Sequence, residues 1–139
     1  MGRNKRNKRT NGGAECPCGS GRARSACCGR YLDGAAAAAT AEALMRSRYT
    51  AFVEGREDYL LATWHTSTRP ASLDPDPGQR WLGLSVRAIE RGGERDTEGR
   101  VEFVARSRVR GRGVRLHERS RFQREDGCWV YVDGEFPDA

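Results

Sequence analysis

The length and composition of the chain favour one domain of ordinary size with a small appendage, because only 37% of its 139 residues are hydrophobic and the mean hydropathy is −0.80. No apolar run approaches the roughly 20 residues that span a bilayer. No apolar stretch follows the basic N-terminus, as it would in a secretory signal. We therefore expect a cytoplasmic protein and exclude membrane-spanning and secreted classes.

The net charge of +6 is concentrated in the N-terminal fifth of the chain. Residues 1–31 carry eight basic residues and one acidic residue, a net +7, whereas residues 32–139 carry seventeen basic and eighteen acidic residues, a net −1. This asymmetry is typical of an arm that meets an anionic partner, although a solubilising tail over residues 1–14 gives the same pattern. We predict a disordered basic tail over residues 1–14, a cysteine unit over residues 15–34 and an α+β domain over residues 35–139.

Four of the five cysteines lie close together in the pattern Cys-x-Cys-x8-Cys-Cys: Cys16, Cys18, Cys27 and Cys28. Four thiols in a short segment suit tetrahedral Zn²⁺, and the intervening glycines allow a tight turn around the metal. A thioredoxin-like centre needs Cys-x-x-Cys before a helix, and a disulfide between adjacent cysteines is strained. The spacing therefore predicts a structural zinc site with four cysteine ligands.

Three arginines accompany the predicted zinc site: Arg22, Arg24 and Arg30. They offset the −2 charge of a zinc tetrathiolate and are candidates for binding a partner. The fifth cysteine, Cys128, stands alone on the last predicted strand, and we expect it to be a small buried residue.

Two helices are predicted after residue 35. Thr40 is a suitable N-cap, apolar residues recur at helical spacing after it, and Gly55 ends the run. A second short helix is predicted from Glu57 to Trp64, and the proline-rich stretch 66–79 is predicted to be a loop. We expect Trp81 and Leu82 on a short turn or helix before the strands.

From residue 84 the pattern changes to alternation, which predicts four strands over residues 84–92, 100–110, 113–125 and 128–136. Short glycine-containing connections make these an antiparallel meander. The second and third strands each have an apolar face and an arginine-rich face, with Val104 on the arginine-rich side. The sequence therefore predicts helices packed on the apolar face of a four-stranded sheet.

Two resemblances follow from these motifs. "CPCGSGRARSACCG" resembles the SEC-C motif, a zinc-binding tail first known from the bacterial SecA translocase, although Arg24 stands where that motif usually has Tyr or Phe. "TAEALMRSRYTAF", "DYLLATWH", "WLGLSV", "LHERSRF" and a terminal W-x-Y-x-D-G look like the YchJ family of small bacterial proteins. Over residues 15–136 this resemblance implies a SEC-C zinc knuckle and a nuclear-transport-factor-2-like, cystatin-like cone domain. It does not indicate which biochemical activity the protein has.

A cone fold of this kind implies a pocket between sheet and helices, and some of its relatives are isomerases or dehydratases. Glu118 is the main candidate inside it, since alternation places this carboxylate on the apolar face, where Arg46 or Arg48 could pair with it. The other candidates are His65, Tyr49, Tyr59, His117 and Glu102. No Ser-His-Asp order or phosphate loop is found, so we favour a non-enzymatic role.

The favoured function is therefore a zinc-stabilised binding module whose knuckle and basic arm dock an acidic protein surface. The SEC-C resemblance supports this reading, because that motif is implicated in docking a chaperone in the translocase. Single-stranded RNA is the alternative partner. It is less favoured because no aromatic residue lies between the cysteines to stack on a base, and Tyr31 lies just outside them.

Overall fold

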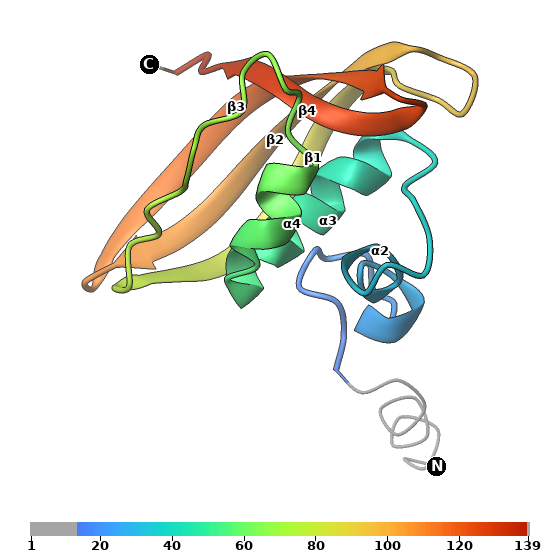
Figure 1. Ribbon diagram of the computed structural model, residues 1–139. Helices are drawn as coiled ribbons and strands as arrows, with labels where there is room; N and C mark the ends of the chain where they lie inside the picture. The colour runs from blue at the N-terminus through green and yellow to red at the C-terminus, as the bar shows by residue number, and fades with distance from the viewer. Residues whose placement is uncertain (1–13, 139) are drawn as a thin grey trace.

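The computed structural model describes residues 14–138, which form a curved antiparallel sheet with helices on its concave face and a small cysteine-rich unit near the N-terminal end (Figure 1). The helical elements are η1 (Arg24–Ala26), α2 (Gly29–Leu32), α3 (Ala41–Glu54) and α4 (Glu57–Ala62). The strands are β1 (Gln79–Arg91), β2 (Glu98–Val109), β3 (Arg112–Glu125) and β4 (Cys128–Glu135). The predicted α+β class and four-stranded sheet are confirmed. The predicted tail lies outside the described residues, apart from Ala14.

Helix α3 begins and ends where its capping residues predict. The Thr40 side chain accepts a hydrogen bond from the Ala43 backbone N–H at 3.1 Å. Gly55 takes the left-handed conformation (φ 72°) that closes the last turn. Helix α4 ends at Ala62, two residues before the predicted end. None of the described helices is long and apolar enough to cross a bilayer.

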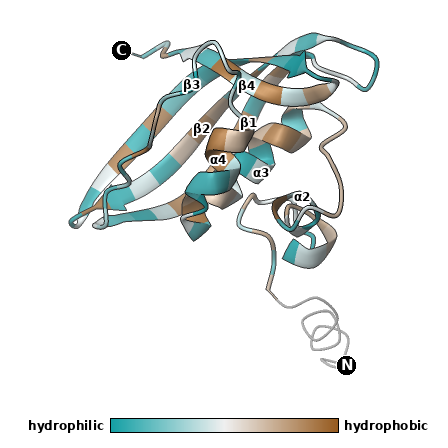
Figure 2. Ribbon diagram, viewed as in Figure 1, coloured by the Kyte–Doolittle hydropathy of each residue, from teal (hydrophilic) through white to brown (hydrophobic). Residues whose placement is uncertain are grey.

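The sheet is a meander in which each strand pairs with the next, in the order β1-β2-β3-β4. The β2–β3 and β3–β4 connections have two residues each, Arg110-Gly111 and Asp126-Gly127. All four of these residues have positive φ, as a type I′ hairpin turn requires. The alternation of hydrophilic and hydrophobic residues along the strands is visible in Figure 2.

The expectation for Trp81 and Leu82 is wrong, because both residues lie within β1. The register between β1 and β2 shifts by one residue between Trp81 and Gly83, so Leu82 is an extra residue in the strand. Leu82 is exposed, and a bulge of this kind bends a strand while breaking its alternation. The bulge therefore interrupts the alternation near the start of β1, so the sequence pattern did not predict that part of the strand. It also contributes to the curvature of the sheet.

The apolar core consists of two clusters. One joins the four clustered cysteines to Leu32, Ala51 of α3 and Leu60 of α4. The other joins the N-terminal half of α3 to the sheet through Ala41, Leu44, Met45, Val101, Phe122 and Trp129. Helix α3 contributes to both clusters, so it connects the cysteine-rich unit to the sheet.

One expectation about burial is wrong. Cys128 is exposed, because it is the first residue of β4, immediately after the tight turn, at the end of the sheet. Val104 lies on the arginine-rich face by alternation, yet it is only 2% exposed. Its neighbours on that face include Glu102 and the cross-strand partner His117, whose polar groups bind each other.

Candidate metal centre and pocket

The four clustered cysteines bring their sulfur atoms to one point in the knuckle (residues 15–34). All four sulfurs lie within 4.8 Å of one another, and those of Cys18 and Cys27 are 3.6 Å apart. No cysteine of the cluster is more than 4% exposed. A tetrahedral zinc ion with Zn–S distances of ~2.3 Å spaces its sulfurs by roughly 3.8 Å. The donor set therefore fits a closed tetrathiolate metal site.

Glycines in the first turn of the knuckle allow this convergence. Gly19 and Gly21 have φ values of 84° and 87°, a conformation that residues with a Cβ rarely adopt. Across this turn the Cys16 N–H donates to the carbonyl of Arg22 at 2.8 Å. The short helix η1 then returns Cys27 and Cys28 to the first two cysteines, as the spacing predicts, and α2 begins directly after Cys28.

Hydrogen bonds also surround the sulfur atoms. The Ser20 hydroxyl lies 3.1 Å from the Cys27 sulfur, and the Thr50 hydroxyl of α3 lies 3.6 Å from the Cys16 sulfur. Hydrogen bonds with Cys18 and Cys28 lower the pKa of Cys16, whereas sharing protons with Cys16 raises the pKa of Cys18 and Cys28. A bound metal ion would supply the charge that several thiolates need.

The knuckle is fixed to helix α3 by charged hydrogen bonds. Arg24 donates to both carboxylate oxygens of Glu54, at 2.6 and 2.9 Å, and Arg46 donates to the carbonyl of Cys18 at 2.7 Å. The motif usually has an aromatic residue at this position. Arg24 instead makes a bidentate contact with the last residue of α3. Arg56, between α3 and α4, donates to the carbonyl of Leu32 at 3.1 Å.

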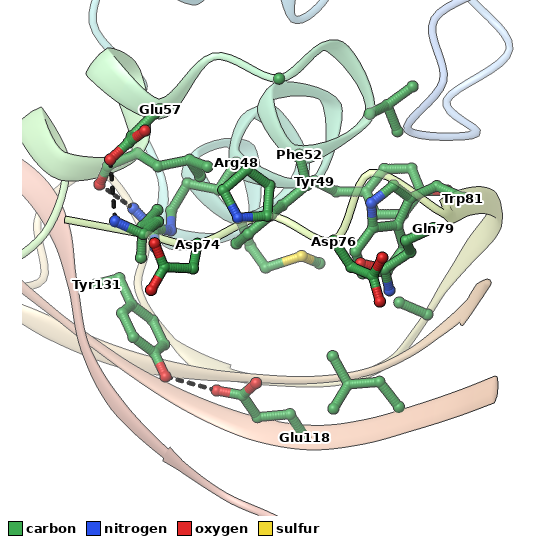
Figure 3. A pocket seen from close by; sticks show the side chains of 18 of the residues that line it. Arg48, Tyr49, Phe52, Glu57, Asp74, Asp76, Gln79, Trp81, Glu118 and Tyr131 are labelled. Atoms are coloured by element: carbon green, nitrogen blue, oxygen red, sulfur yellow. Dashed lines mark hydrogen bonds between the residues drawn. The ribbon is translucent and has the colours of Figure 1, made fainter. Parts of the chain in front are cut away.

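A pocket of about 1050 Å³ lies between the concave face of the sheet, helices α3 and α4, and the loop that precedes β1. Figure 3 shows Tyr131 and Glu118 on the sheet side, Arg48 and Tyr49 on the helix side, and Asp74 on the loop. Aromatic residues supply much of the wall. They are Tyr49, Phe52, Trp64, Trp81, Phe103, Phe122 and Tyr131.

Comparison with known proteins decides the family. A family model described as "YchJ, middle NTF2-like domain" matches residues 40–134, which contain α3, α4 and the first three strands with nearly all of β4. The chain belongs to the YchJ-like family. The fold expected from the resemblance is therefore confirmed.

Relatives match more of this YchJ-like chain than the length of the cone domain (residues 35–139). A UPF0225 protein of Chromobacterium violaceum is 61% identical over 125 residues, covering 87% of this chain and 92% of that protein. A UPF0225 protein of Streptomyces coelicolor is 58% identical over 123 residues, covering 88% and 96%. These matches extend beyond the NTF2-like domain.

Two solved structures have the same fold. A SEC-C motif containing protein from Rhodopseudomonas palustris is 37% identical with a TM-score of 0.77, covering 87% of this chain and 97% of that one. A second from Psychrobacter arcticus is 27% identical with a TM-score of 0.70, covering 85% and 80%. With the four-cysteine cluster, these matches confirm the SEC-C motif in this YchJ-like protein.

The structure places only two of the pocket candidates inside the pocket, Glu118 and Tyr49. Among the lining residues neither His65 nor Tyr59 appears. The His65 ring instead accepts from the Ser67 backbone N–H at 3.1 Å, and its Nε2 lies 3.7 Å from Glu125. The Tyr59 hydroxyl lies 2.7 Å from that of Ser47. Both residues therefore have structural contacts outside the pocket.

The predicted ion pair of Glu118 with Arg46 or Arg48 is not formed between these described residues. Glu118 instead accepts hydrogen bonds from the Tyr131 hydroxyl at 2.8 Å and the Ser120 hydroxyl at 2.9 Å. Arg46 pairs with Glu42 of its own helix at 3.0 Å. Arg48 is bonded elsewhere in the pocket wall, and its importance as a buried pocket cation was missed, although its spacing from Leu44 and Met45 already placed it beside the apolar stripe of α3.

His117 lies on the outer face of the sheet, between two carboxylates. Its Nε2 is 2.7 Å from Glu102 and its Nδ1 is 2.8 Å from Asp138. Neither His117 nor Glu102 belongs to the pocket lining. Contact with Glu102 first, and then with Asp138, raises the pKa of His117 above its ordinary 6.5.

This arrangement predicts a pH dependence of stability. Because the folded state holds the His117 proton more tightly than the unfolded state, the contribution is complete below pH 6.5 and is lost as pH rises through the raised pKa. Urea unfolding from about pH 6 to about pH 9 should show this decline. A His117→Gln variant should show a flatter profile over the same range. An unchanged slope in that variant would exclude His117 as the source.

Proposed function

We propose that this protein is a zinc-stabilised binding module in which the metal is structural. The observation that carries this proposal is the convergence of four buried cysteine sulfurs within 4.8 Å. Catalytic zinc sites keep a coordination position for water or substrate, whereas four thiolates complete the tetrahedron. Cys16, Cys18, Cys27 and Cys28 are the proposed ligands. A reducing compartment keeps such thiols free of disulfides, which supports a cytoplasmic location.

The proposed role of the zinc is to hold the knuckle on the cone domain. The cysteines pack against Ala51 and Leu60. Arg24 and Arg46 add hydrogen bonds between the knuckle and α3. The knuckle is therefore fixed in orientation relative to α3. A surface carried by the knuckle would be presented to a partner in a defined direction.

We further propose that the knuckle and basic arm dock an acidic protein surface. Several arginines on the outer face of the sheet are paired with carboxylates, for example Arg121 with Asp133 at 3.0 Å and Arg115 with Asp138 at 2.7 Å. Arg22 is exposed and has no ion pair within residues 14–138. Arg24 is engaged with Glu54, so its part in partner binding is confined to its exposed edge.

Arg30 also faces inward, which makes single-stranded RNA the less favoured partner. Its guanidinium lies 4.9 Å from the centre of the Tyr31 ring and donates to the Tyr31 hydroxyl at 3.0 Å. The aromatic residue nearest the knuckle is therefore already covered by a cation and offers one less surface for a stacked base. An acidic protein surface needs charge complementarity but no stacking.

The docking proposal is tested by neutralising the charges of the arm. Glutamine replaces Arg22 and the basic residues of the first nine positions, and cross-linked partners are compared with those of the wild type in the presence of nuclease. A matched control neutralises an equal number of exposed arginines elsewhere, including Arg87, Arg106 and Arg108. We expect the arm variant alone to lose its protein partner. Loss in both variants, or dependence on intact RNA, would contradict the proposal.

A further inference from the structure

The pocket contains two charged side chains of opposite sign that do not pair with each other. Arg48 and Glu118 are each only 7% exposed, and no ion pair joins them among the described residues. Burying a charge without an opposite charge is costly, because the protein interior replaces the hydration of the ion only in part. Two such groups in one cavity indicate a site that is completed by a ligand.

Some of the hydrogen-bond donors of Arg48 are unused within residues 14–138. Its three hydrogen bonds all leave from Nη1, to the carbonyl of Leu60 at 2.8 Å and to the carbonyl and hydroxyl of Thr63 at 3.3 and 2.7 Å. No hydrogen bond within residues 14–138 uses its Nε or Nη2. These two N–H groups form the side of a guanidinium that binds a carboxylate through two parallel hydrogen bonds. Burial lowers the pKa of Arg48 to about 10, which still leaves it charged at neutral pH.

Two aromatic rings hold the guanidinium in place. Its central carbon lies 4.8 Å from the centre of the Tyr131 ring and 5.0 Å from that of the Trp64 ring. Tyr131 and Trp64 also pack edge to face at 5.0 Å. Because the rings and the three hydrogen bonds fix Arg48 before any ligand arrives, little conformational entropy remains to be lost on binding.

Glu118 is likewise oriented through one of its two oxygens. Both the Tyr131 and the Ser120 hydroxyls donate to Oε2. Burial and the charge of Glu118 raise the pKa of Tyr131, so Tyr131 remains a donor. The second oxygen, Oε1, accepts no hydrogen bond from residues 14–138, and Figure 3 shows the Glu118 carboxyl facing the open space of the pocket. It is available to a donor on a ligand.

Much of the remaining wall is apolar, beside the charged residues Glu57, Asp74, Asp76 and Arg80. Leu60, Phe103 and Phe122 line the pocket along with Met45 and Leu116. The indole N–H of Trp64 is buried and has no hydrogen-bond partner among residues 14–138, although Trp64 itself lines the pocket. An unsatisfied buried donor costs free energy in the empty state, and an acceptor on a ligand would remove that cost.

We propose that the pocket binds a small zwitterionic molecule with an apolar ring, of the aromatic amino acid class. Its carboxylate would bind the Nε and Nη2 groups of Arg48, and its ammonium group would bind Oε1 of Glu118. A simple acid would leave Glu118 unpaired, and a simple amine would leave Arg48 unpaired. Only a ligand with both charges satisfies both residues. None of the four clustered cysteines and no residue of the proposed docking surface lines this site.

Four probes with the same ring test the charge requirement: phenylalanine, 3-phenylpropanoate, 2-phenylethylamine and 2-phenylethanol. Titration calorimetry with the full zinc-loaded chain should show phenylalanine binding at least about tenfold more tightly than each of the others, because every unmatched buried charge costs 1.4 kcal/mol or more. The other protein amino acids are measured beside it. Failure of all amino acids to bind at millimolar concentration, or equal binding of 3-phenylpropanoate, would overturn the proposal.

Charge-removing variants make the test specific to the two residues. Glu118→Gln should shift the preference from phenylalanine to 3-phenylpropanoate, and Arg48→Met should shift it to 2-phenylethylamine. The exposed residues Glu90 and Arg87 provide control variants, Glu90→Gln and Arg87→Met, which should keep the wild-type order. Circular dichroism checks folding of each variant. If Arg48→Met does not fold, the reversal in Glu118→Gln decides, and an unchanged order of probes there would refute the assignment.

Discussion

Replacing Cys18 by serine is expected to abolish stoichiometric zinc binding and to unfold the knuckle. Cys18 is fully buried, and its sulfur lies 3.6 Å from that of Cys27 at the centre of the cluster. A structural zinc site contributes on the order of 10 kcal/mol to folding, and a serine hydroxyl is a far poorer ligand than a thiolate. Elemental analysis should give one zinc per chain for the wild type and well below one for the variant.

Cys128 provides the matched control for this experiment. It is exposed and lies outside the cluster, so Cys128→Ser should keep one zinc per chain and the wild-type melting temperature. A chelator should lower the melting temperature of the wild type and of Cys128→Ser, and should change Cys18→Ser little. Full zinc occupancy in Cys18→Ser would show that the cluster is not a four-thiolate site.

Unfolding of the knuckle should also destabilise the cone domain. Ala51 and Leu60, on α3 and α4, are 0% and 3% exposed because the cysteines cover them. Loss of that cover exposes apolar surface on two helices that line the pocket, which costs roughly 25 cal/mol for each Å². Loss of the metal would thus reach the pocket through the helices, even though none of the four cysteines lines the pocket.

The elements that could be predicted are those fixed by local chemistry. Thr40 and Gly55 mark the ends of α3 because each satisfies backbone groups that every helix leaves unpaired. The cysteine cluster is encoded almost entirely by spacing, since its ligands lie within one short segment. Strands β2, β3 and β4 follow the alternation of their residues with only small differences in length.

The features that were missed depend on contacts between distant segments. Arg48 lies beside the apolar stripe of α3, but its burial comes from Trp64 and Tyr131, which reach it from the segment after α4 and from β4. Cys128 was assigned to the core by its strand, but its place in the register, opposite Glu125 at the end of the β3–β4 pairing, exposes it. Neither property can be read from neighbouring residues alone.

Replacing Trp129 by alanine is expected to destabilise the sheet cluster by about 3–5 kcal/mol, the range for a large buried aromatic side chain. Trp129 is 2% exposed and packs with residues of α3, β2 and β3. Its indole N–H donates to the carbonyl of Ala39 at 3.1 Å, just before α3 begins, and the Arg124 guanidinium lies 4.5 Å from its ring. The side chain therefore fixes α3 over the sheet, and chemical denaturation measures its contribution.

Two control variants distinguish the packing contribution of Trp129 to stability from that of its hydrogen bond. They also distinguish it from the effect of removing any apolar side chain. Trp129→Phe keeps most of the buried surface and loses the bond to Ala39, so about 1–2 kcal/mol is expected. Leu82→Ala removes a side chain that is 52% exposed, and the expected cost is below about 0.5 kcal/mol. Because the cysteines belong to the other cluster, Trp129→Ala should retain one zinc per chain in its folded state. Loss of zinc from that folded state would mean that the two clusters form one cooperative unit, since the metal site would then depend on how the sheet holds α3.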